Sequence, residues 1–448
     1  MSNMLLTPDG LLSLLQMLKV LPKLVTIQSQ FSILLQLVQN ELMEYFSALL
    51  PNGIRLVHQY VDSPVSHCGI IINTGSRDEA PSEQGMAHFI EHTIFKGTQK
   101  RKSFHILSRL EDVGGEMNAY TTKEETAIHA SFLTEYYQRT IELFSDILIN
   151  STFPDQELKK EQDVIIDEIN SYNDSPSELI FDEFEELIFE GHPIGRNILG
   201  TPENVKAFTR EDIHKFMAVN YNTDQLVICS VGKITSKQFY HLAERYFNQF
   251  PVNKRSFSRP KFTGYTPKFK TVEKETFQAH CLIGGLAYDV LHPNRIPLVL
   301  LNSVMGGQSG NSRLNLALRE RNGIAYNLES SYTAYSDTGT ITIYFGTDKD
   351  NLDKAISLIK REIKILQNKT LGDIQISKAK KQLVGQLAMS QENHEDLMLT
   401  LGKSFLVYNK MDDLDVIYKK INAVTPSQIM DIANDILDFD KLSILIYK

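Results

Sequence analysis

The order of apolar and polar residues in the first half of the chain predicts strands and amphipathic helices in succession. Apolar residues recur either at every second position, as in a half-buried strand, or three and four positions apart, as in a helix that buries one face. The expected strands lie at 44–50, 54–61, 66–75, 118–122, 126–132 and 225–232. The expected helices lie at 104–113, 134–148, 155–173, 178–190, 212–221 and 234–250, with a further helix that begins between Ser82 and Gly85.

Residues 251–270 break this pattern. They are basic, contain three prolines and show no hydrophobic period, which is typical of a linker between domains. We therefore expect an N-terminal domain at 44–250 and a C-terminal domain at 271–448.

The C-terminal domain repeats the order of elements of the N-terminal domain. The sequence HCGI at 67–70 recurs as HCLI at 280–283, an offset of 213 residues. In both domains paired strands lead into an amphipathic helix, a long helix and a final apolar strand. This shared order indicates a duplication, so we expect two homologous domains.

Composition and charge narrow the class of protein. Hydrophobic residues make up 42 % and charged residues 23 % of the 448 positions, as in a globular protein that buries a large core. The net charge of -9 argues against nucleic-acid binding and allows basic or extended polypeptide substrates. The three cysteines, Cys68, Cys229 and Cys281, are too few and too far apart for a disulfide framework. We expect buried thiols in a reducing compartment.

Residues 1–43 form an N-terminal extension that fits no targeting class. Their apolar run at 11–21 is too short and too interrupted to span a membrane. No basic residue precedes Lys19, unlike in a secretory signal, and the first arginine is Arg55, unlike in an Arg-rich presequence. We expect an extension that results from the choice of start site, with Met43 as the alternative start. An uncleaved amphipathic anchor is the second interpretation.

The stretch HFIEH at 88–92 carries the candidate chemistry. On a helix, His88 and His92 lie one turn apart on the same face and could bind a single zinc ion. Glu91 borders that face and could accept a proton from a water at the metal, the arrangement of inverted zincins. The alternative is an ordinary amphipathic helix with two solvated histidines.

The duplicated domain indicates that this pattern is functional. At the offset of 213 residues, His88, Glu91 and His92 correspond to apolar residues, which are Leu301, Val304 and Met305. The C-terminal domain thus keeps the helix pattern without the candidate ligands. We infer that one domain is catalytic and the other is its metal-free partner.

A catalytic zinc site needs a third protein ligand and an open position. The charged helix at 155–173 carries Glu161 and Glu168 seven residues apart, two turns along one face. Their counterparts in the C-terminal domain, Ala379 and Gln386, are not metal ligands. The spacing alone is more typical of a solvated acidic helix face.

Together these residues resemble the pitrilysin/insulinase family of zinc metallopeptidases. The resemblance rests on H-x-x-E-H, on Glu168 76 residues after His92 and on Glu161 seven residues earlier. The stretches FKGT, GGEMNAYT, HPIGRNILG and RLNLALRERNGIAY match the family as well. The resemblance covers residues 44–448. Within the family, it is closest to the bacterial branch that is similar to the mitochondrial processing peptidase.

The resemblance implies an α+β fold with two homologous domains that close as a clamshell. Each domain would be a mostly antiparallel sheet with helices packed on one face. One Zn²⁺ per chain would be held by His88, His92 and Glu168. Glu91 would be the general base, and Glu161 would orient a histidine ligand or balance the charge of the site.

The resemblance also gives the C-terminal domain a part in the reaction. Tyr326 would stabilise the oxyanion, and Arg319 would bind a carbonyl of the substrate backbone. Without the resemblance to the family, we would interpret Arg319 as an arginine at a helix end and Tyr326 as a core tyrosine. The glycine-rich stretch at 306–310 resembles a flexible loop of the processing-peptidase branch and lacks the pattern of a dinucleotide site.

Asn118, Ala119 and Tyr120 would form an edge strand to which a substrate peptide adds as a further strand. The expected function is zinc-dependent endopeptidase activity on peptides or unfolded polypeptides. The expected assembly is a homodimer or a heterodimer with a similar subunit, in the bacterial cytoplasm rather than the mitochondrial matrix. The alternatives are a catalytically silent clamshell, which binds peptides or serves as an assembly subunit, and a structural zinc site, which the positions of the cysteines do not favour.

Overall fold

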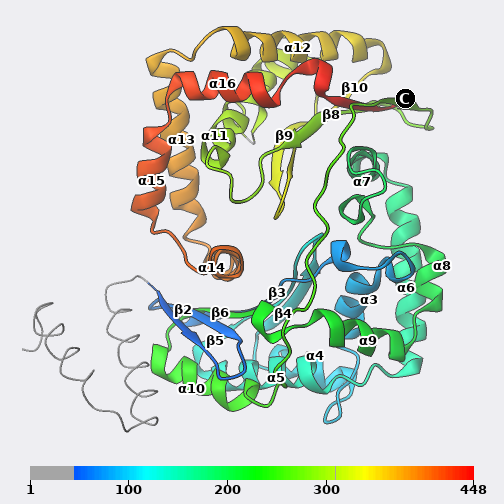
Figure 1. Cartoon of the computed structure of the whole chain (residues 1–448), viewed down its shortest axis with the longest axis vertical. Helices are drawn as coiled ribbons and strands as arrows, with labels where there is room; N and C mark the ends of the chain where they lie inside the picture. Colours follow the sequence, from blue (N-terminus) through cyan, green and yellow to red (C-terminus); the bar gives the residue numbers. More distant parts are fainter. Residues whose placement is uncertain (1–44, 308) are drawn as a thin grey trace, which may run out of the picture.

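A computed structural model describes residues 45–307 and 309–448 (Figure 1). The predicted extension at 1–43 lies outside these residues. Residues 251–268, between the two halves of the chain, form neither helix nor strand and run along the front of the molecule in Figure 1. No helix among the described residues is long and apolar enough to cross a membrane.

The helices and strands follow the predicted order closely. The first half contains β1 (Phe46–Leu49), β2 (Arg55–Tyr60), β3 (Val65–Ile72), α3 (Met86–Thr93), α4 (Ser103–Glu111), β4 (Glu116–Thr121), β5 (Thr126–Leu133), α5 (Tyr137–Asn150), α6 (Asp155–Asn173), α7 (Pro176–Ile188), α8 (Pro202–Ala207), α9 (Arg210–Asn220), β6 (Leu226–Gly232) and α10 (Ser236–Phe247). The second half contains β7 (Phe269–Val272), β8 (Ala279–Ala287), α11 (Arg295–Gly306), the π-helical η6 (Asn315–Glu320), β9 (Leu328–Ala334), β10 (Gly339–Thr347), α12 (Leu352–Asn368), α13 (Asp373–Ser390), α14 (His394–Tyr408), α15 (Leu414–Ala423), α16 (Pro426–Ile436) and β11 (Ser443–Tyr447).

The two halves build equivalent sheets. The first sheet has the strand order β1-β2-β6-β3-β5-β4, and the second has the order β7-β11-β8-β10-β9. The pairs β2/β6 and β7/β11 are parallel, and every other pair is antiparallel. The second order reproduces the first without β1, so the prediction of two homologous, mostly antiparallel α+β halves is confirmed.

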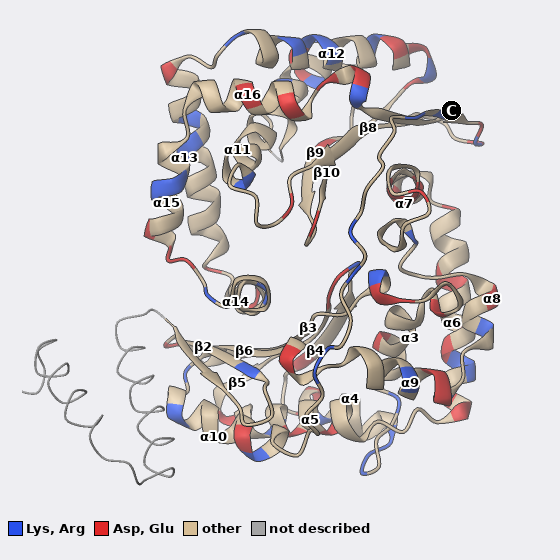
Figure 2. Cartoon of the chain, in the orientation of Figure 1, with Lys and Arg blue, Asp and Glu red and all other residues tan. Residues whose placement is uncertain are grey.

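The outer face of each sheet is covered by helices from the same half of the chain. In the first half, Ile70 and Ile128 of the sheet share a buried apolar core with Phe89 of α3, Phe144 of α5 and Phe239 of α10. A second core beneath α11, α12 and α16 has the same place in the second half. Many of the charged residues belong to the helices that surround the two sheets (Figure 2).

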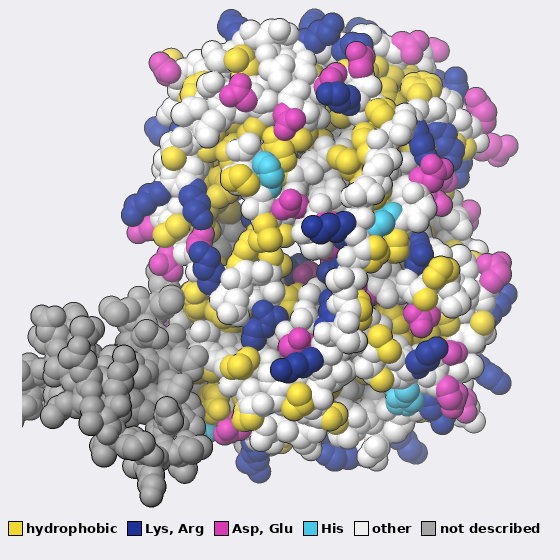
Figure 3. All heavy atoms as spheres, in the orientation of Figure 1, with side chains coloured by type: hydrophobic (Ala, Val, Ile, Leu, Met, Phe, Trp, Pro, Cys, Tyr) yellow, Lys and Arg dark blue, Asp and Glu magenta, His cyan; other side chains and the backbone are white. Residues whose placement is uncertain are grey.

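The inner face of each sheet is covered by a helix from the other half. Helix α14 of the second half packs Met398 and Leu401 against Ile71 and Cys229 of the first sheet. Helix α7 of the first half packs on Leu282 and neighbouring residues of the second sheet. Both helices lie between the sheets in Figure 1, and side chains fill much of the space between the ribbons (Figure 3). Each half of the chain therefore contributes one helix to the inner face of the other half's sheet.

Candidate metal centre

The helix that carries H-x-x-E-H begins at a buried polar cap. Glu79 accepts hydrogen bonds from the backbone N–H groups of Gly85 and Ala87, at 2.9 and 2.8 Å, which replace the helical partners that the first turn lacks. Gly85 has a φ of 98°, and a Cβ there would lie 2.8 Å from Cα of Gly200. Gly200 ends the stretch HPIGRNILG, and a Cβ there would in turn lie 2.6 Å from Cα of Gly85, so both positions need a glycine.

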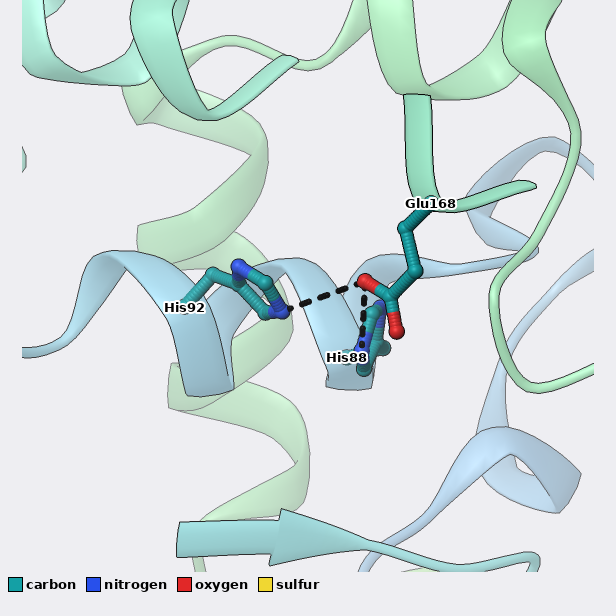
Figure 4. A group of neighbouring side chains, drawn as sticks. All are labelled: His88, His92 and Glu168. Carbon is teal, nitrogen blue, oxygen red and sulfur yellow. Dashed lines mark ion pairs between the residues drawn. The ribbon is translucent and has the colours of Figure 1, made fainter. Parts of the chain in front are cut away.

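The structure brings His88, His92 and Glu168 together. Their possible ligand atoms all lie within 4.8 Å of one another (Figure 4). Oε2 of Glu168 lies 3.8 Å from Nε2 of His88 and 3.5 Å from Nε2 of His92. Helix α3 supplies both imidazoles, and α6 crosses it to supply the carboxylate. Among the described residues, this is the group of histidine, cysteine and carboxylate side chains that could hold a metal ion.

The two histidines have different environments. Burial and the neighbouring His92 lower the pKa of His88 to about 3, so this imidazole is neutral and its lone pair is available to a metal. Burial opposes the charged form of His92 as well. The hydrogen bond to Glu161 and the charges of Glu168 and Glu91 outweigh burial and raise the pKa of His92.

Glu161 fixes the orientation of His92. Nδ1–H of His92 donates to Oε2 of Glu161 at 3.2 Å, which leaves Nε2 of this ring to face Glu168. Lys96 binds the other oxygen of Glu161 at 2.7 Å. Burial raises the pKa of Glu161, but the hydrogen bonds from His92 and Lys96 outweigh it and hold the pKa below its usual value. Glu161 is therefore ionised at neutral pH.

The sequence patterns did not identify Lys96, although the stretch FKGT contains it. Lys96 lies beyond the end of α3 at Thr93, so helical spacing from His92 gives no signal for it. Glu79 and Thr121 were missed as well. Neither residue belongs to a sequence motif whose spacing identifies a functional site.

Glu91 lies beside the three metal-binding candidates in an environment that suits a proton acceptor. Burial and the negative charge of Glu168 raise the pKa of Glu91. The Thr121 hydroxyl and His92 lower it, but their effect is smaller. A carboxylate with a raised pKa holds a proton more readily near neutral pH, which is what general-base catalysis needs.

Zinc fits this donor set. Two imidazole nitrogens and one carboxylate oxygen converge from two helices, and solvent reaches the cluster because 43 % of the Glu168 side chain is exposed. The cysteines are buried and free, so they offer no closed structural site.

Asn118, Ala119 and Tyr120 lie on β4, at the edge of the first sheet. Among the described residues, β4 pairs only with β5. Thr121 at the end of β4 contacts Glu91 through its side chain. The open edge of the sheet therefore starts beside α3.

The structure does not bring Arg319 and Tyr326 into contact with the metal-binding candidates. Arg319 is exposed on the π-helical η6, and Tyr326 precedes β9 with 64 % of its surface exposed. Neither side chain forms a hydrogen bond or an ion pair with the described residues. The exposure of Tyr326 excludes the alternative that it is a core tyrosine.

The second half has an apolar core where the first has its polar cluster. Leu301 and Met305 on α11 are fully buried, and Val304 packs beside them. Gln386 of α13, the counterpart of Glu168, instead binds the Ser309 hydroxyl at 3.2 Å.

Comparisons with known families agree with this asymmetry. The family profile described as "Insulinase (Peptidase family M16)" matches residues 56–202. A second profile, "Peptidase M16 inactive domain", matches residues 207–383.

Relatives align along most of the chain. A protein of Bacillus subtilis named zinc protease YmxG is 33 % identical over 87 % of this chain and 95 % of its own length. The mitochondrial-processing peptidase subunit beta of Saccharomyces cerevisiae is 27 % identical over 90 % of both chains. Among solved structures, a protease from Helicobacter pylori superposes with a TM-score of 0.83 at 20 % identity, over 90 % of this chain and 99 % of that chain. At this low identity, the similarity to the Helicobacter pylori structure shows a shared fold and no more.

Proposed function

The chain belongs to the M16 (insulinase) family of peptidases, and on that premise we propose that it is a zinc-dependent endopeptidase. The observation that supports the proposal most is the convergence of His88, His92 and Glu168 beside Glu91. A catalytically silent protein does not need all four residues, so their presence together favours an active enzyme. The proposed substrates are peptides and unfolded polypeptide segments.

We propose that His88, His92 and Glu168 hold one Zn²⁺. When bound there, zinc polarises the carbonyl of the scissile peptide bond and lowers the pKa of a water molecule. Glu161 keeps the Nδ1 proton of His92 in place, so that Nε2 stays directed toward the site. Lys96 holds Glu161 in its ionised form.

Glu91 would act as the general base. Its carboxylate takes the proton of the attacking water, and the protonated group then passes that proton to the leaving amine. The raised pKa of Glu91 favours the first step, in which the carboxylate takes up the proton and then holds it.

The second half would complete the site. We assign to Tyr326 a hydrogen bond to the oxyanion and to Arg319 a contact with the substrate backbone. Both side chains are exposed and lack protein partners among the described residues, so a bound peptide meets no competition for them. The backbone of Asn118, Ala119 and Tyr120 would hold the peptide as an added strand.

We further propose a homodimer or a pair with a similar subunit, since the yeast relative is named as a subunit. The buried, unpaired cysteines are compatible with a reducing compartment such as the bacterial cytoplasm.

The substitution Glu91→Gln tests the proposal. We expect zinc content to stay at that of the wild type and hydrolysis of a quenched peptide to fall by about 10²- to 10⁴-fold. Zinc is measured by elemental analysis of the dialysed protein, and turnover by fluorescence. Glu111→Gln, at an exposed position of the nearby α4, is the matched control and should keep full activity.

Two results would count against the proposed mechanism. Equal turnover in wild type and Glu91→Gln would remove Glu91 from the reaction. Bound zinc without turnover in either protein, across a broad peptide mixture, would favour the silent peptide-binding clamshell.

A further inference from the structure

Helix α14 belongs to the second half of the chain but lies on the inner face of the first sheet. It enters from α13 and leaves toward α15, and both of those helices belong to the second half (Figure 1). Its apolar side packs on β3 and β6. Two charged residues of this helix, Glu395 and Lys403, extend beyond this core toward β5 and β4.

Lys403 binds the end of the β4–β5 hairpin. Its Nζ lies 2.6 Å from Oε1 of Glu125 and 4.9 Å from the centre of the Tyr120 ring. The Tyr120 hydroxyl donates to the same carboxylate at 3.3 Å. Glu125 also closes the hairpin, because its carbonyl accepts the N–H of Thr122 at 2.8 Å. One ammonium group thus contacts both the end of β4 and the turn that follows it.

Glu395 binds the same pair of strands eight residues earlier on α14. Its Oε1 accepts a hydrogen bond from Nδ1 of His129 at 2.8 Å. His129 is almost completely buried and lies directly opposite Asn118 in the register of β4 and β5. The His129 ring also lies 6.1 Å from the ring of Tyr120. The two contacts therefore span the part of β4 from Asn118 to Tyr120.

An edge strand needs such support. Strand β4 has one hydrogen-bonded neighbour among the described residues, so half of its backbone groups face away from the sheet. A peptide that adds to this edge binds more tightly when the strand is already held in position, since less freedom is lost on binding.

We propose that α14 holds β4 in position for substrate, with Glu395 and Lys403 as positioning residues supplied by the metal-free half. The proposal deepens the proposed peptidase function and rests on it for the identity of the ligand, a peptide in extended conformation. The second half then has a role in substrate binding that is separate from Arg319 and Tyr326.

A charge exchange between Lys403 and Glu125 tests the proposal. We expect Lys403→Glu to raise KM for a ten-residue quenched peptide by about three- to tenfold, while kcat changes less than twofold and zinc content is unchanged. The double substitution Lys403→Glu with Glu125→Lys should bring KM back toward the wild-type value. Lys410→Met, at an exposed lysine just beyond α14, is the control and should leave KM unchanged.

Hydrogen–deuterium exchange of the peptide-free protein gives a readout that does not depend on catalysis. Lys403→Glu should speed the exchange of peptides from 116–133, and the double variant should restore protection. Unchanged exchange in that segment would overturn the proposal even if the enzyme is active. Faster exchange in a protein that hydrolyses no peptide would instead refute the proposed function. Faster exchange with an unchanged KM in an active enzyme would overturn the link to substrate.

Discussion

At the scale of single residues, the candidate site depends on carboxylates whose environments differ. Glu161 is buried between His92 and Lys96 and is held in its charged form, whereas burial raises the pKa of Glu91. Glu168 is the most exposed of the three. In the proposed mechanism the same type of side chain would thus serve as an orienting group, as a proton acceptor and as a metal ligand, according to what surrounds it.

The substitution Glu161→Gln should weaken zinc binding by about 10- to 100-fold, because an amide can accept the proton of His92 but carries no charge to balance Lys96 and the metal. Competition with a chromogenic chelator measures the affinity. Asp163→Asn, which removes an exposed carboxylate from the same helix, is the matched control and should bind zinc like the wild type. If both variants bind equally well, Glu161 has no influence on the metal.

At the scale of elements, the two halves are joined by exchanged helices. Gly402 shows how closely α14 approaches the first sheet. A Cβ at this position would lie 2.7 Å from Sγ of Cys229 and 2.8 Å from Cγ1 of Ile71. The absence of a side chain therefore lets the helix lie directly on the strands.

Gly402→Ala should lower the free energy of unfolding by about 1–3 kcal/mol, because the added methyl group has no space in this core. Gly385→Ala, in the middle of α13, is the matched control. A Cβ at position 385 meets no atom within 4 Å, so alanine should stabilise that helix by up to about 1 kcal/mol. Urea denaturation followed by circular dichroism measures both effects. A stabilised Gly402→Ala variant would show that the contact between α14 and the sheet is looser than described.

The sequence predicts these elements better than it predicts where they pack. The helix at 155–173 has the bounds that its charge pattern predicts, and the strands at 118–122 and 126–132 are in place within a few residues. The exchange of α7 and α14 could not be predicted, because an amphipathic pattern shows that a helix buries one face but not against which sheet. The resemblance to the family, and not the spacing along the helix alone, indicated Glu161 and Glu168, while the position of Tyr326 depends on how two distant halves meet.

At the scale of the whole molecule, the hairpin tips of the two sheets meet in one charged cluster. Arg77, whose side chain is fully buried, binds both oxygens of Asp337 from the β9–β10 turn at 2.7 and 2.8 Å. It also binds Glu124 from the β4–β5 turn at 2.6 Å. Glu124 in turn accepts the N–H of Ser336 at 2.9 Å. This cluster therefore joins the two halves beside the ends of both edge strands.

Asp337→Asn tests how much this contact contributes to stability. Burial raises the pKa of Asp337, but the hydrogen bonds from Arg77 and from the N–H of Phe262 outweigh it and hold the pKa below its usual value. Because the folded-state pKa is lower than the unfolded one, the stabilisation is present above the unfolded value of about 3.9 and is lost as pH falls through the folded value. We expect the variant to lose about 2 kcal/mol of unfolding free energy at pH 7, since the amide keeps some hydrogen bonds but leaves Arg77 without half of its charge partners.

The difference in unfolding free energy between wild type and Asp337→Asn should shrink steadily as pH falls from 5 to 3. Urea denaturation at several pH values measures it, with Asp350→Asn, at an exposed aspartate of the second half, as the control. A difference that stays constant down to pH 3 would mean that the charge of Asp337 does not hold the two halves together.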